Sequence, residues 1–314
     1  MKRFKDADEY PADEGCVLSI GNFDGFHLGH RKVVGVCLEK SRALGIASTV
    51  LTFEPHPLEV LSPDRAPRRI ATPEVRAELL EEFGLDRLVE HPFSTDLASL
   101  SAEEFVDRFV MGAFKARCVV VGRGFRFGRK RSGDEDVLRK LGQERGYEVI
   151  VVEEADLDGE VISSSRVRLL LARDADVSGA ARLLGRPHRV HGVIVRGRGR
   201  GRSLGFPTAN LEQVPELIPA RGIYACMSHM GASARPAAVH VGPRLTFDDE
   251  STVEAYIVGQ DHDQDLYDEL LRLDFLEMIR EPKKFDDKDD LVEQIRMDVD
   301  RTVEIVQGYG KEEA

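Results

Sequence analysis

Two histidines three residues apart, His27 and His30, have the type and spacing to stabilise charge on a phosphate group. Both belong to the run Gly21-Asn22-Phe23-Asp24-Gly25-Phe26-His27-Leu28-Gly29-His30. Its glycines let backbone N–H groups approach a ligand closely, and the predicted helix that follows attracts anions at its N-terminus. The alternative is a pair of helix-capping or zinc-binding side chains, but no third metal ligand stands nearby in the sequence.

A serine run is the second predicted phosphate contact. It reads Ile162-Ser163-Ser164-Ser165-Arg166-Val167-Arg168 and has the form of a helix start. Hydroxyls, free amides and the Arg168 guanidinium would converge there on an anion. On its own, such a run more often only caps a helix, so its functional interpretation depends on the histidine motif.

Two further segments follow predicted strands and should gather at the same edge of a sheet. They are 52–57, with His56, and 122–128, with Phe125 and Phe127. Aromatic rings at this edge could stack on a planar ligand. The alternative for the two phenylalanines is core packing beneath a loop.

A glycine- and arginine-rich run in the last third predicts another phosphate site. It reads Gly197-Arg198-Gly199-Arg200-Gly201-Arg202-Ser203-Leu204-Gly205-Phe206-Pro207-Thr208-Ala209-Asn210. It lacks the GK[ST] ending of a phosphate-binding P-loop and does not open into a predicted helix. A nucleic-acid-binding tail is the alternative, but the run is short and continues into apolar positions. A glycine flap would instead cover a triphosphate, with Thr208 and Asn210 as oxygen ligands for Mg²⁺.

Phosphoryl transfer to an alcohol benefits from a carboxylate that takes the hydroxyl proton. Glu254, in the strand-like run Thr252-Val253-Glu254-Ala255-Tyr256, is the predicted base. The alternative is an ordinary solvated glutamate on a strand.

The elements that must position the first group of residues alternate in type. Short apolar runs at 17–20, 49–53, 119–121 and 149–152 predict buried strands. One helical stripe of apolar residues follows His30, and a second spans 74–83, with Val75, Leu79 and Leu80. A capping box of Ser101 with Glu104 marks the start of a third helix. This alternation predicts a Rossmann-like parallel sheet with helices on both faces.

The C-terminal part of the sequence has a different pattern, with short strand-like runs in place of alternating strands and helices. Runs at 189–195, 222–227, 237–241 and 252–258 are separated by glycine and proline turns and predict a small antiparallel barrel or sandwich. A closing helix is predicted over 287–306, with Leu291, Ile295, Val299 and Val303 on one face. This change in sequence pattern predicts an N-terminal domain at 1–180 and a C-terminal domain at 181–314.

Composition narrows the class of protein. The 314 residues are 42% hydrophobic and 32% charged, typical of folded globular domains, and the length suits two domains. A net charge of −12 disfavours nucleic-acid binding. The four cysteines form no CxxC pair, and no run approaches the ~20 apolar residues of a membrane span. We therefore expect a cytoplasmic protein with reduced thiols that binds neither nucleic acid nor membrane.

The two motif sets together resemble a known family. The histidine run resembles the HxGH signature of nucleotidyltransferases. The glycine-arginine run resembles the riboflavin kinase domain, together with the segments that follow it: Gly222-Ile223-Tyr224-Ala225, Thr246-Phe247, VEAY at 253–256, Asp265-Leu266-Tyr267, Arg280 and Lys284-Phe285-Asp286. Over roughly residues 15 to 306 the chain resembles the bacterial bifunctional riboflavin kinase/FAD synthetase family.

The resemblance implies two activities. The C-terminal barrel would phosphorylate riboflavin to FMN with ATP and Mg²⁺, and the N-terminal domain would adenylylate FMN to FAD, releasing pyrophosphate. His27, His30, Ser164 and Arg168 would handle adenylyl transfer, with Glu254 as the kinase base and Thr208 and Asn210 on Mg²⁺. The implied ATP contacts also include Gly21, Asn22, Phe23, Asp24, Gly25, Gly29, Gly197, Gly199, Gly201 and Arg202, and the implied flavin contacts are His56, Phe125, Phe127 and Arg280.

Several positions depart from the family pattern. Gly124 stands where an acidic or amide residue is common, His240 replaces asparagine, Leu245 replaces proline and Asp268 replaces glycine. Gly124 favours a competing function, that of a monofunctional riboflavin kinase whose first domain is degenerate or regulatory. Two more functions stay open on the sequence: a cytidylyl- or adenylyltransferase for a phosphorylated alcohol, and a non-catalytic flavin sensor. We expect a monomer or weak homo-oligomer that acts on small molecules.

Overall fold

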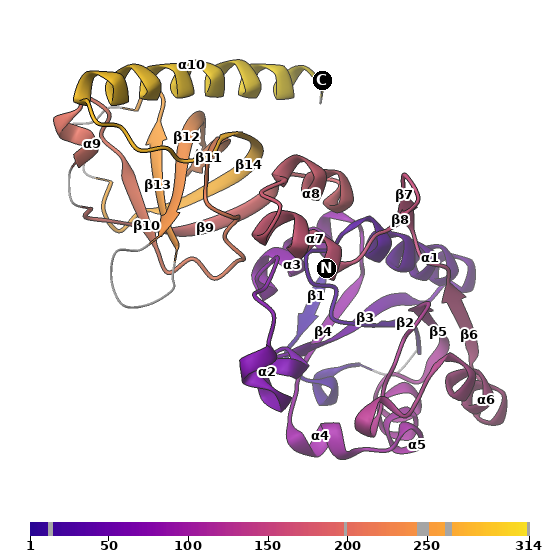
Figure 1. The fold of residues 1–314 in the computed structure, drawn as a ribbon. Coiled ribbons are helices and arrows are strands. Elements are labelled where there is room, and N and C mark those ends of the chain that lie inside the picture. Colours follow the sequence, from indigo (N-terminus) through magenta and orange to yellow (C-terminus); the bar gives the residue numbers. More distant parts are fainter. Residues whose placement is uncertain (12–14, 198–199, 244–250, 261–265, 313–314) are drawn as a thin grey trace. The chain divides into compact units, whose positions relative to one another are not determined.

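The computed structural model describes residues 1–11, 15–197, 200–243, 251–260 and 266–312 (Figure 1). The chain divides into two compact units. The first unit comprises Met1–Pro67 and Thr72–Ile162, and the second comprises Arg68–Ala71 and Ser163–Ala314. The division into domains at 180/181 stays a prediction, and we describe each compact unit by itself.

The first unit contains a six-stranded sheet in the order β1-β4-β3-β2-β5-β6. All of its pairings are parallel, which confirms the predicted Rossmann-like sheet. The bounds are β1 (Lys2–Phe4), β2 (Cys16–Ile20), β3 (Ala47–Glu54), β4 (Arg87–Pro92), β5 (Ala116–Gly122) and β6 (Glu148–Val152). Four of these strands were predicted, and β1 and β4 were not.

Helices cover both faces of this sheet. The helical segments are η1 (Ala7–Glu9), α1 (Leu28–Leu44), α2 (Pro57–Leu61), η2 (Pro63–Arg65), α3 (Pro73–Glu82), α4 (Thr95–Ser99), α5 (Ala102–Phe105), the π-helical η3 (Val106–Ala113), η4 (Arg129–Arg131) and α6 (Glu135–Arg145). A short hairpin of β7 (Asp156–Leu157) and β8 (Glu160–Val161) follows β6. The predicted capping box is present, because Ser101 and Glu104 each accept the other's backbone N–H.

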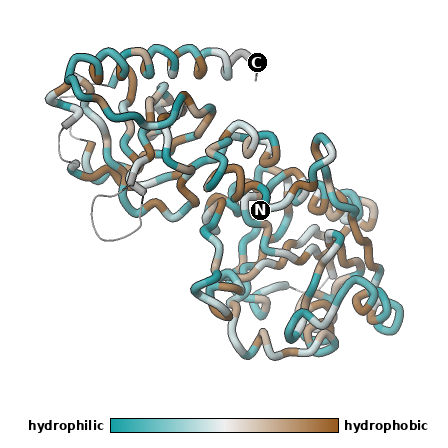
Figure 2. Tube along the Cα trace, viewed as in Figure 1, coloured by the Kyte–Doolittle hydropathy of each residue, from teal (hydrophilic) through white to brown (hydrophobic). Residues whose placement is uncertain are grey.

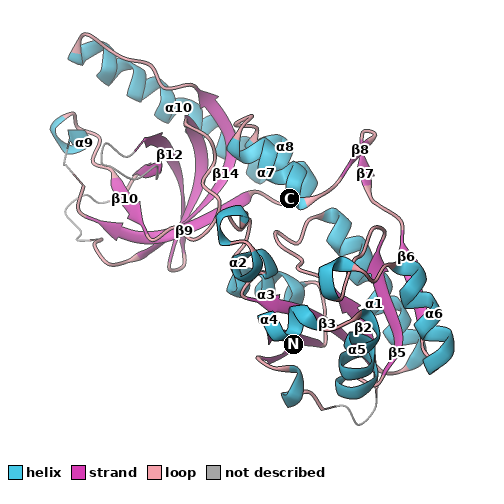
Figure 3. Ribbon diagram, turned by 60° about the horizontal axis from the view of Figure 1, so that its bottom comes forward, coloured by secondary structure: helices cyan, strands magenta, loops and turns pink. Residues whose placement is uncertain are grey.

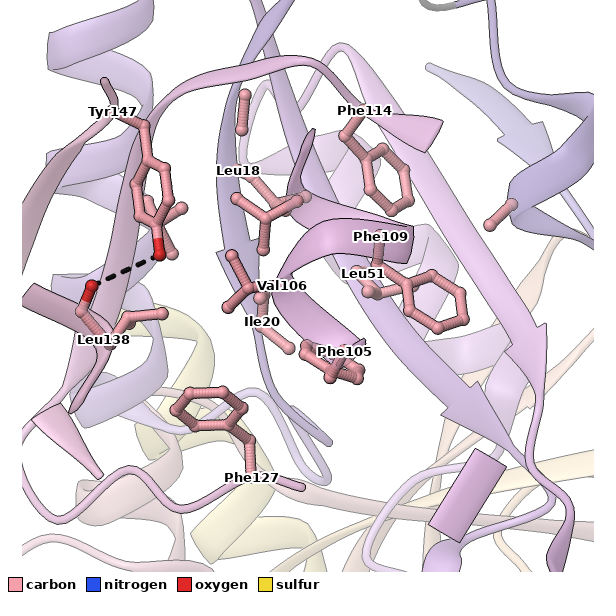
Figure 4. Packing of buried hydrophobic residues seen from close by; sticks show 14 of the residues in the cluster. Leu18, Ile20, Leu51, Phe105, Val106, Phe109, Phe114, Phe127, Leu138 and Tyr147 are labelled. Carbon is pink, nitrogen blue, oxygen red and sulfur yellow. Dashed lines mark hydrogen bonds between the residues drawn. The ribbon is translucent and has the colours of Figure 1, made fainter. Parts of the chain in front are cut away.

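Side chains that alternate along the strands form a separate core on each face. Leu18 and Ile20 of β2 pack in the cluster that contains Phe105, Phe109 and Leu138 (Figure 4). On the opposite face, Val17 packs with Cys37 of α1, and Val50 packs with Val34 and Leu80. All four cysteines are buried and free.

The buried face of α3 differs from the predicted stripe. The helix buries Arg76, Ala77 and Leu80, whereas Val75 and Leu79 are only half-buried. The prediction is confirmed at Leu80 and at Leu79, which packs against the same core cluster, but it missed Arg76 because it weighed only apolar side chains. The helix instead turns an arginine inward, where it pairs with carboxylates.

The second unit contains a closed antiparallel barrel in the order β10-β13-β12-β11-β14-β9 (Figures 1 and 3). The predicted barrel is therefore confirmed. Its strands are β9 (His188–Val195), β10 (Ala209–Glu212), β11 (Gly222–Met230), β12 (Ser233–Pro243), β13 (Ser251–Ile257) and β14 (Leu270–Arg280). The helices of this unit are α7 (Ser164–Ala172), α8 (Val177–Leu184), α9 (Arg200–Ser203) and α10 (Lys288–Glu312).

The barrel strands point alternate residues inward. Val239, Val241, Val253 and Ala255 are buried in the barrel, and the residues between them on β12 and β13 face outward. The interior is filled mainly by apolar side chains, together with the buried His188 of β9 and Ser228 of β11. Polar residues of β12 and β13 lie on the outer surface.

Helix α10 packs over β11, β12 and β14. Hydrophilic and hydrophobic residues alternate along it (Figure 2). Its fully buried positions are Asp298, Thr302 and Val306, while Leu291, Ile295 and Val299 are half-buried. The closing helix is confirmed, but the centre of its buried face is polar, because Asp298 has an ionic partner on the barrel.

Candidate active sites

The two motif histidines lie against each other at the start of α1. His27 is the N-cap residue, and its Nδ1 accepts the backbone N–H of His30 at 3.2 Å. The two rings stack with centroids 3.6 Å apart and an interplanar angle of 16°. A side chain at Gly29 would crowd this arrangement, because its Cβ would lie 3.1 Å from Nδ1 of His27 and 3.3 Å from the carbonyl oxygen of Ile162.

This geometry determines which ring nitrogen of His27 can donate a hydrogen bond. Because Nδ1 of His27 accepts a hydrogen bond, the neutral ring carries its proton on Nε2 and can donate it. The first turn of α1 contains no acidic residue, so its N-terminus keeps its attraction for anions. The site therefore suits a phosphate, and phosphate binding there stays a prediction.

The turn between β2 and α1 is held in an unusual backbone conformation. Phe23 and Phe26 have φ values of 50° and 42°, a region that residues other than glycine seldom occupy. Their side chains are 3% and 1% exposed and pack in the same cluster as Val34 of α1. Burial of these two rings offsets the backbone strain and fixes the loop that presents the histidines.

Asn22, in the middle of this turn, connects it to neighbouring elements. Its carbonyl oxygen accepts from Thr52 Oγ1 of β3 at 3.4 Å and from Nη1 of Arg76 at 3.3 Å. Its side-chain Nδ2 lies 3.1 Å from Nε2 of His56, which caps α2. The prediction that the segment containing His56 gathers beside the histidine motif is thus confirmed, whereas its contact with flavin stays a prediction.

Arg76 was not among the predicted site residues. It is 5% exposed, and its Nη2 donates to Glu90 Oε1 at 3.1 Å and lies 3.5 Å from Glu54 Oε2. Burial alone would raise the pKa of Glu90, but hydrogen bonds from Arg3 and Lys5 hold that pKa below its usual range. An arginine on the stripe that ends at Leu80 is the sequence signal that could have revealed this network.

Replacing Arg76 with methionine is expected to slow the FAD formation that the sequence resemblance implies for this site roughly tenfold to a hundredfold, because small displacements in a site carry rate costs of that order. Glu90 keeps Arg3 and Lys5 as partners in this variant, so the lost contacts that matter are those to Asn22 and Glu54. Rates of FAD formation from supplied FMN would measure the effect.

Thermal unfolding would show how far the variant is also destabilised, since a buried ionic partner is lost. Arg42→Met, which removes an exposed guanidinium from α1, is the matched control. Unchanged FAD formation in Arg76→Met would show that the Asn22 turn does not depend on this side chain.

The two phenylalanines in the loop after β5 differ in burial. Phe127 is 7% exposed and packs against Phe105 in the core (Figure 4), as the core-packing interpretation predicts. Phe125 is half-buried and stacks on Phe127 with centroids 5.5 Å apart. Contact of either ring with flavin stays a prediction. Gly124 has a φ of +79°, a conformation that glycine, asparagine and aspartate tolerate best. Glycine at this position therefore allows the same backbone conformation of the turn as the acidic or amide residue that is common in the family.

The serine run begins a helix, as predicted. Ser163 is the N-cap of α7, and its side chain accepts the backbone N–H of Arg166. Ser164 follows as the first helical residue, and Nε of Arg168 donates to the carbonyl oxygen of Arg68 at 2.9 Å. These residues belong to the second compact unit, and their role in adenylyl transfer stays a prediction.

The glycine-arginine run follows β9 and leads into β10. A Cβ on Gly197 would overlap the carboxamide of Asn210, and one on Gly201 would overlap the carbonyl oxygen of Phe206 and lie 3.3 Å from Thr208 Oγ1. The backbone therefore passes close to both predicted metal ligands. The run does contain a short helix, α9, which the sequence analysis did not expect.

Some predicted positions lie outside the described residues. These are Arg198, Gly199, Leu245, Thr246, Phe247 and Asp265. Arg202 is exposed on α9. At the described ends of the run, Arg196 lies over the ring of Tyr267 at 5.0 Å, and Phe206 meets Tyr256 edge-on at 5.3 Å.

The predicted base and a predicted metal ligand are cross-strand neighbours. Glu254 of β13 is paired with Asn210 of β10 on one side and with His240 of β12 on the other. Directly opposite residues share a face, with Cβ atoms about 5 Å apart. All three are half-buried on the outer surface of the barrel. The register thus assembles a carboxylate and a carboxamide that stand 44 residues apart in the chain.

Arg280 lies on the same row, because Ile223 of β11 is paired with both His240 and Arg280. Its Nη2 donates to Asp298 Oδ2 at 2.7 Å, and its Nε donates to Oδ1 at 2.9 Å. Gln294 also donates to Oδ1, at 3.0 Å. The ion pair fastens α10 to the barrel, a role that the sequence analysis missed. The contact of Arg280 with flavin stays a prediction.

The described part of the chain has neither a clustered metal centre nor a membrane-spanning helix. No group of three or more His, Cys, Asp or Glu side chains there has the geometry to hold a metal ion. None of the described helices is both long enough and apolar enough to cross a membrane.

Two family models match this chain. The model described as FAD synthetase matches residues 9–166, and the model described as riboflavin kinase matches residues 184–306. The first match contains His27 and His30, and the second contains Thr208, Asn210 and Glu254.

Curated relatives match nearly the whole chain. A bifunctional riboflavin kinase/FMN adenylyltransferase from Pseudomonas fluorescens is 37% identical over 291 residues, 92% of each chain. The protein of the same description from Escherichia coli K12 is 34% identical over 91% of each chain. The crystal structure of a macrolide-efflux protein from Streptococcus pneumoniae is 31% identical, with a TM-score of 0.86 over 96% of this chain and 97% of that one.

Proposed function

This chain belongs to the bifunctional riboflavin kinase/FMN adenylyltransferase family, and from that premise we propose which of its residues carry each reaction. The protein phosphorylates riboflavin to FMN and adenylylates FMN to FAD, with ATP as co-substrate. The match to the FAD synthetase model disfavours a monofunctional kinase. One observation carries the assignment of residues: His27, His30 and Ser164 lie in the segment that matches the FAD synthetase model, and Thr208, Asn210 and Glu254 lie in the segment that matches the riboflavin kinase model.

For adenylyl transfer, the phosphate oxygen of FMN attacks the α-phosphorus of ATP, and the bond to the bridging oxygen of pyrophosphate breaks. Negative charge builds up on the α-phosphate oxygens in the transition state. The Nε2–H of His27 and the ring of His30, stacked 3.6 Å away, would stabilise this charge. Preorganised donors are effective because they need no rearrangement during reaction.

The backbone around the histidines would bind the remaining phosphates. Gly21, Asn22, Phe23, Asp24 and Gly25 form the strained turn that precedes α1, and Gly29 allows the histidines to stack. We assign Ser164 and Arg168 to the outer phosphates of ATP on the resemblance of their motif. Hydroxyls and a guanidinium are suitable partners for such oxygens.

For riboflavin phosphorylation, the carboxylate of Glu254 would take the proton from the ribityl hydroxyl. The hydroxyl oxygen then attacks the γ-phosphorus of ATP, and the bond to the β–γ bridging oxygen breaks, releasing ADP. The pairing of Glu254 with Asn210 supports this role, because it places the base beside a group that would face the triphosphate. Backbone N–H groups of Gly197, Gly199 and Gly201, with Arg202, would cover the phosphates.

Mg²⁺ is the ion that we propose for the kinase site, and the residues present fit it. Thr208 and Asn210 offer a hydroxyl and a carboxamide oxygen, which are ligands that Mg²⁺ prefers. Gly197 and Gly201 leave the backbone close to both side chains, where a Cβ would intrude. Such an ion usually takes one or two protein ligands and completes its shell with water and phosphate oxygens, and it neutralises phosphate charge when bound.

His56, Phe125, Phe127 and Arg280 are the proposed flavin contacts; the rings of His56 and Phe125 are half-buried, and that of Phe127 is buried. We also propose that the protein works in the cytoplasm, as a monomer or weak homo-oligomer, without binding nucleic acid. The net charge of −12 and the four free cysteines support these proposals.

Product analysis tests the proposal directly. The purified protein is incubated with riboflavin, ATP and Mg²⁺, and the flavins are separated over time. We expect FMN to appear first and FAD to follow, and omission of Mg²⁺ should prevent FMN formation. Formation of FMN without FAD would refute the proposed first site, whereas unchanged FMN formation after chelation of Mg²⁺ would refute the ion.

A further inference from the structure

His240 occupies a position on the kinase site that the proposed mechanism does not use. It lies on the outer face of β12, directly opposite Glu254 of β13, so the two Cβ atoms are about 5 Å apart. Its side chain is half-buried. The imidazole is therefore a direct neighbour of the proposed base.

Gly242, two residues further along the same strand, makes room for this ring. A Cβ at Gly242 would lie 2.7 Å from Cε1 and 2.9 Å from Nε2 of His240. The imidazole thus lies across the backbone of Gly242 on the outer face of β12. Thr252, opposite Gly242, donates its hydroxyl to the Gly242 carbonyl oxygen at 3.4 Å, so the surface beneath the ring is itself fixed.

The charged groups around His240 come from several elements. Burial lowers the pKa of His240 below its usual 6.5; Glu254 on β13 opposes this shift, while Arg280 on β14 and Arg221 ahead of β11 add to it. Asp298 of α10 pairs with Arg280 and belongs to the same set. The imidazole is consequently neutral at pH 7 and becomes cationic only in acid.

We propose that His240 is a positioning residue that tunes the general base of the kinase reaction: the neutral imidazole leaves the Glu254 carboxylate available, and the protonated imidazole pairs with it. A carboxylate paired with a cation is a weaker proton acceptor. Phosphorylation of riboflavin therefore slows when His240 becomes charged. This inference rests on the role of Glu254 proposed above.

The test combines a pH profile with a direct titration. Rates of riboflavin phosphorylation are measured between about pH 5 and 8 for the wild type, His240→Asn and His229→Asn, the last removing another half-buried barrel histidine. His240→Asn should match the wild type within about threefold near pH 8 and lose less of its rate in acid, since asparagine does not titrate. His229→Asn should keep the wild-type profile.

Gly242→Ala provides an independent perturbation, because it displaces the ring without removing it. Gly242→Ala alone should change the acid limb of the pH profile. Added to His240→Asn, it should have no further effect on that limb, and the double-mutant cycle would reveal this difference. Equal effects in both backgrounds would show that Gly242 acts without His240 and would count against the inference.

NMR titration of His240 separates this inference from the proposed function. Because Glu254 raises the pKa of His240, Glu254→Gln should lower it further, whether or not Glu254 is the base. If the titration of His240 is the same in Glu254→Gln as in the wild type, the inference is overturned and the proposed function is not. The same holds if Glu254→Gln phosphorylates riboflavin slowly but His240→Asn has the same acid limb as the wild type. Normal phosphorylation by Glu254→Gln would overturn the proposed base and, with it, the inference.

Discussion

FAD formation by His30→Ala should fall roughly a thousandfold, while riboflavin phosphorylation stays within about twofold of the wild type; the first figure is the order of loss when a preorganised donor to a transition state is removed. The ring of His30 is stacked on His27 at the N-terminus of α1. Its loss would remove the charge stabilisation that we propose at the α-phosphate, and it also removes the ring against which His27 stacks.

The measurement isolates the adenylyl transfer: FMN is supplied with ATP, and the appearance of FAD and pyrophosphate is followed. His229→Ala, which removes a histidine that pairs with Asp274 on the barrel, is the matched control and should leave FAD formation unchanged. A similar decrease of both activities in His30→Ala would show that the motif does not serve adenylyl transfer specifically.

Riboflavin phosphorylation by Glu254→Gln should fall roughly a hundredfold to ten-thousandfold, the range attributed to a general base. Glutamine has nearly the same shape and should preserve the β13 pairing, but it cannot accept the hydroxyl proton at neutral pH. The decrease should appear in kcat more than in KM, because proton transfer belongs to the transition state. FAD formation from supplied FMN should be unaffected.

Glu277→Gln is the control for this variant. Glu277 of β14 pairs with Arg301 of α10 at 3.1 Å, and such exposed pairs contribute little to stability. Both variants should therefore unfold near the wild-type temperature. A normal kcat for Glu254→Gln would show that Glu254 is not the base that the cross-strand geometry indicates, whereas early unfolding of this variant alone would show that Glu254 also stabilises the barrel.

The strands that the sequence analysis missed are those that carry charge for structural reasons. β4 reads Arg87-Leu88-Val89-Glu90-His91-Pro92, and its polar residues interrupt the apolar run that marks a buried strand. Glu90 is nevertheless fully buried, because Arg3 of β1 and Arg76 of α3 neutralise it. Only the three-dimensional structure shows that these three charges meet, so local patterning could not identify either β1 or β4.

The site residues were predictable where they share a short motif and unpredictable where register brings them together. The stacking of His27 and His30 follows from their spacing at a helix start. The pairing of Glu254 with Asn210 and His240 depends on how β13 aligns with two other strands, and a slip of one residue would turn the carboxylate inward. The partnership of Arg280 with Asp298 likewise joins a strand and a helix that only tertiary structure places together.

Dissecting this enzyme into separately expressed halves requires attention to the four residues Arg68–Ala71, which are grouped with the second compact unit although they interrupt the first in sequence. The carbonyl oxygen of Arg69 accepts the N–H of Leu217 at 2.7 Å, and that of Arg68 accepts Nε of Arg168. A kinase fragment that starts at Ser163 would lose both acceptors, and one that starts at residue 181 would also lose the Leu171 carbonyl that binds the N–H of Ala220. No single cut of the polypeptide yields both pieces with their native hydrogen bonds.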